Sequence, residues 1–238
     1  MDGITLARLT NAHHEAIDEL RSGGPVVWVE ALGAWMVLDR SVAIDVLRDA
    51  ERFTVDDPRF ATAQVVGPSM LSLDGAEHRR HRDPFATAFR PPLVMARYAP
   101  RVAAEARVIV ERLRPAGRAD LVASLAGPLA AWTAAFSLGL DAVGSGTLLG
   151  WYRRIVAATE ERSVGAARHD DVTEAAHRAM DALRMALTDA AREPDTALAE
   201  IATGLSIDEL VSNAAVFLFG AIETTEGMIA NLLALLVD

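Results

Sequence analysis

The pattern of apolar and polar positions predicts a mainly helical protein with a small β hairpin near the N-terminus. Apolar residues at helical spacing predict helices over 11–21, 41–48, 76–90, 97–113, 122–138, 144–161, 170–192 and 206–236. Two segments rich in β-branched and aromatic residues, 26–32 and 34–39, are separated by Gly33 and predict the hairpin. Residues 56–68 have no clear period and contain two prolines, so they predict a loop. We expect residues 1–238 to form a single domain.

The last predicted helix has a clear start and an unusual middle. Ser206 and Glu209 match the S-x-x-E capping box, in which each side chain satisfies a backbone N–H of the first turn. A helix of about 30 residues then runs roughly 45 Å, at 1.5 Å per residue. It carries the sequence FLFGAIETTEGMIAN at 217–231, in which polar residues interrupt an apolar helix. Such an interruption needs a reason.

Gly220 and Thr224 suggest that reason. An interior glycine costs a helix about 1 kcal/mol relative to alanine, and the hydroxyl of Thr224 can donate to the carbonyl of Gly220 and bend the helix. A groove would then open beside Gly220 and Ala221. Glu223 places a carboxyl group next to that hydroxyl, a pairing that suits proton relay. The alternative is a polar stripe that faces another helix.

A second motif lies at 72–92, SLDGAEHRRHRDPFATAFRPP. Asp74 and Glu77 form another capping signature. His78 and Arg82 are four residues apart on one helix face, where they offer charge-assisted donors to a carboxylate or phosphate. The alternatives are a solvated basic face and a zinc site at His78 and His81. The zinc site is disfavoured because neighbouring arginines repel a cation and no third ligand is near.

Composition narrows the function classes. The 238 residues are 51% hydrophobic and carry a formal net charge of −10, which disfavours a nucleic-acid binder. There is no cysteine, so disulfides and thiolate chemistry are excluded for these residues. The N-terminus lacks a signal-peptide core, and the most apolar stretches, 126–140 and 210–222, are too short to span a bilayer. We therefore expect a cytoplasmic protein without a membrane or nucleic-acid partner.

Together the two motifs resemble those of the cytochrome P-450 superfamily of haem-thiolate monooxygenases. The bacterial distal helix of that family carries A-G-x-(D/E)-T-(T/S), and residues 220–225 match it with Ala-Gly reversed to Gly-Ala. Its C helix carries H-x-x-x-R after D-x-x-E and ends in F-x-P, as do residues 74–91 here. The resemblance covers nearly the whole chain. It implies a mainly α, incomplete P-450-like fold, the N-terminal portion that ends at the long distal helix and lacks the E-x-x-R helix and the Cys haem loop.

The resemblance also implies roles for single residues. His78 and Arg82 would bind the haem propionates, and Gly220 and Ala221 would form the slot above the haem. Glu223 and Thr224 would deliver protons to the oxygen-binding side, as the catalytic residues. The loop 57–70 and the helices within 144–192 would shape the substrate pocket, Arg79 and Arg80 would face an acidic ferredoxin, and no residue is expected to ligate the metal.

The implied activity is oxidation of a small organic substrate with O₂. It would need haem b and electrons from NAD(P)H through a separate ferredoxin and reductase. Since no cysteine can supply the axial thiolate, we expect the chain alone to be inactive and to need a missing C-terminal half. The alternative is a haem-free P-450-like scaffold that binds or activates a partner enzyme. A third hypothesis is an all-α ligand-binding regulator, but the sequence shows no DNA-reading element.

Overall fold

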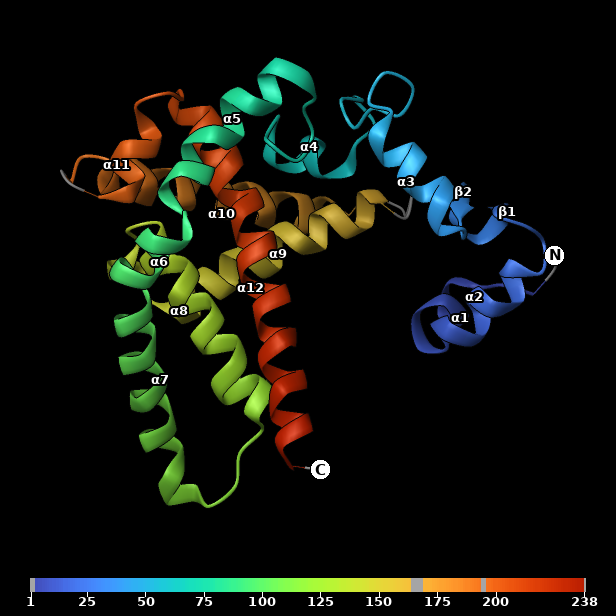
Figure 1. Cartoon of the computed structure of the whole chain (residues 1–238). Helices are drawn as coiled ribbons and strands as arrows, with labels where there is room; N and C mark the ends of the chain where they lie inside the picture. The colour runs from blue at the N-terminus through green and yellow to red at the C-terminus, as the bar shows by residue number, and fades with distance from the viewer. Residues whose placement is uncertain (1–2, 164–168, 194–195, 238) are drawn as a thin grey trace. The chain divides into compact units, whose positions relative to one another are not determined.

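The computed structural model describes residues 3–163, 169–193 and 196–237. It forms two compact units, Met1–Thr54 and Val55–Asp238. Figure 1 shows the course of the chain through its elements. Each unit has its own core, and each is described by itself.

The first unit contains the predicted hairpin between short helices. Its elements are α1 (Leu6–Asn11), α2 (His13–Arg21), β1 (Val26–Val29), β2 (Ala34–Val37) and α3 (Arg40–Arg48). The strands are antiparallel, with Val26 opposite Val37 and Val29 opposite Ala34. The turn between them ends at Gly33, whose φ of 58° is the left-handed conformation that glycine adopts without a steric penalty. Alternate strand residues Val27 and Val29 are buried, so one face of the hairpin supplies the small core.

The second unit is helical over its described residues. Its helices are α4 (Ala61–Val66), α5 (Gly75–Ala88), α6 (Pro91–Arg97), α7 (Ala99–Leu113), α8 (Gly127–Ser137), α9 (Ser145–Ser163), α10 (Asp170–Ala190), α11 (Ala197–Ala202) and α12 (Ile207–Val237). A π-helical segment, Val122–Ala126, leads into α8. The mainly helical fold with one hairpin is the predicted fold class.

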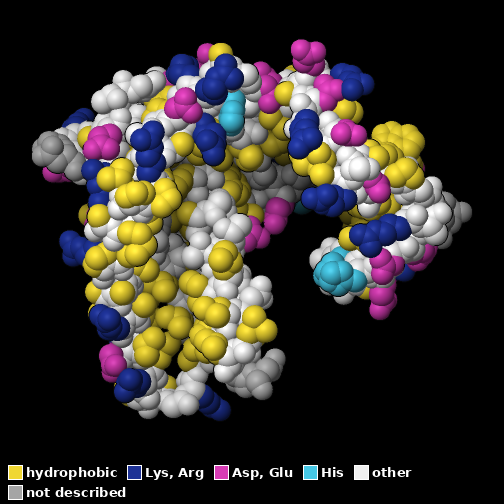
Figure 2. Space-filling model, viewed as in Figure 1, with side chains coloured by type: hydrophobic (Ala, Val, Ile, Leu, Met, Phe, Trp, Pro, Cys, Tyr) yellow, Lys and Arg dark blue, Asp and Glu magenta, His cyan; other side chains and the backbone are white. Residues whose placement is uncertain are grey.

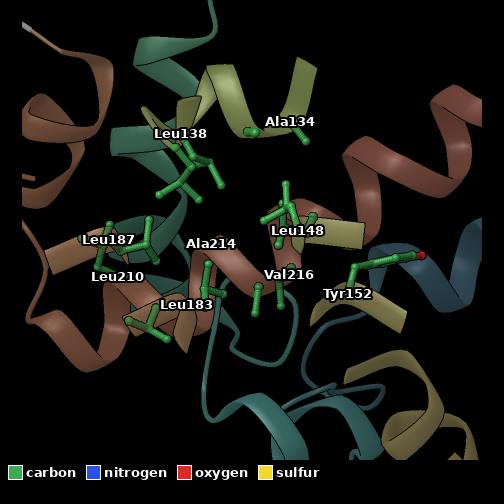
Figure 3. Close-up of a cluster of buried hydrophobic side chains, with 14 of the residues drawn as sticks. Ala134, Leu138, Leu148, Tyr152, Leu183, Leu187, Leu210, Ala214 and Val216 are labelled. Atoms are coloured by element: carbon green, nitrogen blue, oxygen red, sulfur yellow. The ribbon is translucent and has the colours of Figure 1, made fainter. Parts of the chain in front are cut away.

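The core of this unit forms around the first half of α12, which packs against α8, α9 and α10. Figure 3 shows leucines from α9, α10 and α12 that meet Leu138, the residue after α8, in one cluster. Small residues such as Ala134 and Ala214 lie among them and are fully buried. Their short side chains allow the helices to approach closely, which accounts for the alanine-rich sequence.

Some local predictions need correction. The loop expected at 56–68 contains helix α4, because Val66 is buried in the core and the short helix packs against α9 and α12. Helices α6 and α11 were not predicted as separate elements. Asp74 stands at the N-cap of α5 but makes no side-chain capping bond, and its carboxylate instead accepts the N–H of Val55 at 3.1 Å.

The start of α12 agrees with its prediction. The N–H of Ser206 donates to Oε2 of Glu209 at 2.8 Å, and the N–H of Glu209 donates to Oγ of Ser206 at 3.3 Å. By length and composition, residues 207–236 of this helix could cross a membrane, a test that the core helix of a soluble protein also passes. The burial of its first half is typical of a core helix.

The second half of α12 lies at the surface. Its large apolar side chains are mostly exposed, namely Met228, Leu232, Leu235 and Leu236. Figure 2 shows hydrophobic side chains gathered along the lower parts of α7 and α12. An apolar stretch of this kind on a soluble protein usually marks a surface that another element or partner covers.

Candidate functional site

Helix α5 presents the two predicted anion-binding residues on one face. His78 is half-buried and Arg82 is exposed, one helical turn apart. Within the described part of the chain, neither side chain makes a hydrogen bond or an ion pair that would occupy its donors. The face is therefore free to bind an anionic group such as a carboxylate.

Arg80 and His81, between those two residues, have a different role. Arg80 forms ion pairs with Glu77 and with Glu209 of α12, which raise its pKa above the usual value. His81 is only 2% exposed, and its Nδ1 lies 2.8 Å from Nδ2 of Asn213 on α12. These contacts join α5 to α12, so Arg80 is engaged within the chain rather than free for a ferredoxin.

Asn213 is the centre of that junction. Its Oδ1 accepts the N–H of Met70 at 2.8 Å, so its Nδ2 is left to donate to the carbonyl of Glu209 and to His81. Nδ1 of His81 then accepts from Asn213, while Nε2 of the same ring lies 3.0 Å from Nη2 of Arg80 and 3.5 Å from Oε1 of Glu209. The sequence did not indicate this buried network, because an asparagine 132 positions after a histidine gives no local signal that the two side chains meet.

Glu209 completes the junction. Hydrogen bonds from Arg80, and then from the backbone of Ser206, lower the pKa of its carboxyl to about 2. His81 is thus part of a structural network. Within the described ranges no cluster of three or more His, Cys, Asp or Glu side chains could hold a metal ion.

The middle of α12 shows the predicted threonine bond. Oγ1 of Thr224 donates to the carbonyl of Gly220, while the α-helix continues through both residues. A Cβ added to Gly220 would have no heavy-atom neighbour within 4 Å, so this face of the helix is open. Gly220, Glu223 and Thr224 are all exposed along it.

Glu223 has a partner that the sequence did not indicate. The hydroxyl of Tyr152 on α9 donates to Oε2 of Glu223 at 3.1 Å. Burial, followed by the charge and hydrogen bond of Glu223, raises the pKa of Tyr152 above its usual value. The two residues are 71 positions apart, and only packing of α9 against α12 brings them together.

Ala221 faces a different space from Gly220. It lines an apolar pocket of about 490 Å³ formed by α6, α7, α8 and α12. The other α12 residues that line it are Phe217 and Thr225, and an alanine stripe on α7 supplies the opposite wall. The predicted pocket walls, 57–70 and the helices within 144–192, do not line it; residues 164–168 of that range lie outside the described residues.

The predicted site residues thus form two groups. One group, His78 and Arg82, lies on α5, a helix that Arg80 and His81 join to α12 at Glu209 and Asn213, about ten residues before Glu223 and Thr224. Ten helical residues span about 15 Å. A ligand that touched both groups would need an anionic end for the donors of His78 and Arg82 and a part that fits beside the open face at Gly220.

Haem meets these requirements only in part. Its propionates suit the unoccupied donors of His78 and Arg82, and the open face at Gly220 offers room for a flat ring. The chain contains no cysteine for the axial thiolate. The residues present suit the propionate and distal sides of a haem group, whereas no residue of this sequence can supply an axial thiolate.

Comparisons with known proteins identify the fold. No family model matches the sequence. The structure is similar to P450BioI, solved in complex with hexadec-9Z-enoic acid ligated acyl carrier protein, with a TM-score of 0.77, 18% identity, and coverage of 98% of this chain and 63% of that one. It is similar to Sorangium cellulosum So Ce56 cytochrome P450 260B1, with a TM-score of 0.76, 24% identity, and coverage of 94% and 57%.

A third similar structure is epothilone B-bound cytochrome P450epoK, with a TM-score of 0.75, 19% identity, and coverage of 97% of this chain and 63% of that one. The chain therefore spans roughly three fifths of the length of these proteins. The predicted resemblance is confirmed at the level of the fold: the chain has the bacterial cytochrome P450 fold over the part that it spans.

Proposed function

We propose that this chain forms part of a bacterial cytochrome P450 monooxygenase, an enzyme that uses haem and O₂ to oxidise a small organic substrate. The observation that carries the proposal is the hydrogen bond from Thr224 to the carbonyl of Gly220, beside Glu223, in the middle of α12. A P450 fold and a distal-helix motif support each other here, because the motif lies on α12, the longest helix among the described residues.

His78 and Arg82 would hold the haem propionates. Both can donate to a carboxylate from one face of α5, and each charge-assisted hydrogen bond contributes about 1.5–3 kcal/mol. When it is bound with a thiolate ligand, haem supplies the oxygen-activating chemistry. Since the chain has no cysteine, that ligand would come from the remaining part of the enzyme, and the chain alone would be inactive.

Glu223 and Thr224 would handle protons beside the open face at Gly220. The hydroxyl of Thr224 donates its proton to the Gly220 carbonyl, so its lone pairs stay available to accept a proton or a water hydrogen. Glu223 lies next in sequence and supplies a carboxyl group that can exchange protons with solvent. Ala221 faces the apolar pocket, and its place beside Gly220 in the slot above the haem stays a prediction.

Electrons would come from NAD(P)H through a separate ferredoxin and reductase. Arg79, like Arg82, is exposed on α5 and has no ion pair within the described residues, and it suits an acidic partner. We propose a cytoplasmic location without a membrane or nucleic-acid partner. We also propose that residues 1–238 act as one part of a single P450 domain.

A haem titration of the purified chain tests the proposal. Haemin should bind, and His78→Ala and Arg82→Ala should each weaken the affinity about tenfold, which corresponds to about 1.4 kcal/mol. Arg79→Ala is the matched control, since it removes an exposed arginine of the same helix without touching the donor face. Equal affinities for all four proteins would contradict the assigned propionate site.

A second candidate function is a haem-free P450-like scaffold that binds or activates a partner enzyme. The absence of cysteine and the exposed apolar half of α12 favour it. It predicts a chain that stays monodisperse without haem and shows no saturable haemin binding. The same titration therefore separates the two candidates.

A further inference from the structure

Tyr152 makes a contact that connects α9 to the candidate proton-handling residue. Its hydroxyl lies 3.1 Å from Oε2 of Glu223, and the side chain is only 8% exposed. Figure 3 shows that the ring lies at the edge of the buried cluster and directs its hydroxyl oxygen away from the aliphatic side chains. A buried tyrosine usually places its hydroxyl against a partner, and here the partner is the carboxylate of Glu223.

The ring of Tyr152 is itself held in place. It packs edge-on against Phe219 of α12, with ring centroids 5.8 Å apart and an interplanar angle of 69°. Phe219 lies one helical turn before Glu223, on the same side of α12. One turn of α12 therefore fixes the ring and the next turn receives the hydroxyl, so the donor position is set by packing.

The hydroxyl of Tyr152 also stays protonated. Burial raises its pKa, and the neighbouring carboxylates Glu223, Glu226 and Glu160 raise it further. An ordinary tyrosine loses its proton near pH 10, so this one remains a hydrogen-bond donor throughout the physiological range. Glu223 thus has a permanent donor on one oxygen, whereas its Oε1 has no hydrogen-bond partner within the described residues.

We propose that Tyr152 is a positioning residue for Glu223. It holds one carboxylate oxygen and leaves the other available for proton exchange. Without it Glu223 would be an exposed glutamate with several accessible rotamers. The inference rests on the proposed role of Glu223 in proton handling, and it adds that α9 controls where that carboxyl group lies.

Nuclear magnetic resonance of the full chain tests the hydrogen bond directly, because the chain has only two tyrosines, Tyr98 and Tyr152. In protein labelled with ¹³C at the tyrosine Cζ, Tyr98→Phe and Tyr152→Phe assign the two signals. Glu223→Ala should move the Tyr152 signal and leave that of Tyr98 unchanged. Glu226→Ala, which removes a neighbouring charge without removing a hydrogen-bond acceptor, should move it less.

Side-chain mobility tests the positioning role. Tyr152→Phe keeps the ring against Phe219 and removes only the hydroxyl, so the fold should be retained. In glutamate-labelled protein, the Glu223 signal should show faster side-chain motion in Tyr152→Phe than in the parent chain or in Tyr98→Phe. An unchanged Tyr152 signal in Glu223→Ala, or unchanged Glu223 motion in Tyr152→Phe, would overturn the proposal. Neither experiment uses haem, so the proposed function stands or fails separately.

Discussion

The two halves of α12 have similar apolar sequences and opposite surroundings. In the first half, Ile207–Ile222, side chains such as Leu210 and Leu218 are fully buried, and a polar junction ties the helix to α5. In the second half, beyond Glu223, the leucines are largely exposed. Apolar content alone therefore does not define a core; the neighbours of the helix do.

The boundary between the halves coincides with the candidate site. Gly220, Glu223 and Thr224 lie where packing against α8, α9 and α10 gives way to open surface. The first half is held by packing, and the exposed second half leaves room for a ligand and a covering element.

The largest difference in unfolding free energy should be between a buried and an exposed leucine of α12. Leu218 is 0% exposed and Leu235 is 77% exposed. Leu218→Ala leaves a cavity in the core and should lower the free energy of unfolding by about 2–5 kcal/mol. Leu235→Ala is the matched control and should stay within about 0.5 kcal/mol. Urea unfolding measures both, and similar losses for the two variants would mean that the halves are equally packed.

The polar junction between α5 and α12 should contribute less to the free energy of unfolding than the core does. Asn213→Ala removes the acceptor for the N–H of Met70 and the donor to the buried His81, which leaves both groups unsatisfied. The expected loss is about 1–3 kcal/mol of unfolding free energy. Asn231→Ala, on the exposed second half, should change it by less than about 0.5 kcal/mol. A junction that is unimportant would give the same small value for both asparagines.

The carboxylate of Glu209 should make a smaller, pH-dependent contribution to the free energy of unfolding than Asn213 does. Its pKa is lowered from 4.5 to about 2, chiefly by the hydrogen bond from Arg80. A lowered carboxyl pKa stabilises the fold above the unfolded value and loses that contribution as the pH falls through the folded value. Because the pair is partly exposed to solvent, Glu209→Gln should cost about 1 kcal/mol near pH 7.

The pH series distinguishes that charge effect from a packing effect. Urea unfolding of the parent chain and of Glu209→Gln should converge as the pH falls from about 4.5 to about 2. Glutamine keeps the capping geometry of the first turn. A difference that persists unchanged at low pH would show that the carboxylate charge is not its source.

The smallest effect on stability should come from the exposed apolar face. Replacement of Leu232 and Leu235 by serine removes surface that is already in water, so unfolding should change by less than about 0.5 kcal/mol. The same variant should show less concentration-dependent association in light scattering. Unchanged association would mean that this face does not attract other molecules.

The sequence predicted the longer helices, the hairpin and the Thr224–Gly220 bond because each depends on neighbours within a few positions. Helix periodicity and the capping box at Ser206 are local signals. Helix α4 was mistaken for a loop because it has only six residues, too few for a period, and forms through contact with the core.

The contacts of the candidate site were less predictable. The His81–Asn213 and Tyr152–Glu223 pairs join residues 132 and 71 positions apart, and only the packed fold brings them together. At Asp74 a local pattern predicted a contact that does not form: the carboxylate accepts the N–H of Val55 instead of capping α5. Local patterns thus predicted which residue types matter, and tertiary contacts decided what they bind.

The measurement that tests the central claim most directly is the carbon monoxide spectrum of the reduced, haemin-loaded chain. The account assigns the propionate and distal sides of a haem site to His78, Arg82 and the open face at Gly220, with no thiolate in the chain. It predicts haem that is bound and reducible but lacks the thiolate-type absorbance. A normal thiolate-ligated spectrum from the purified 238-residue protein would contradict it.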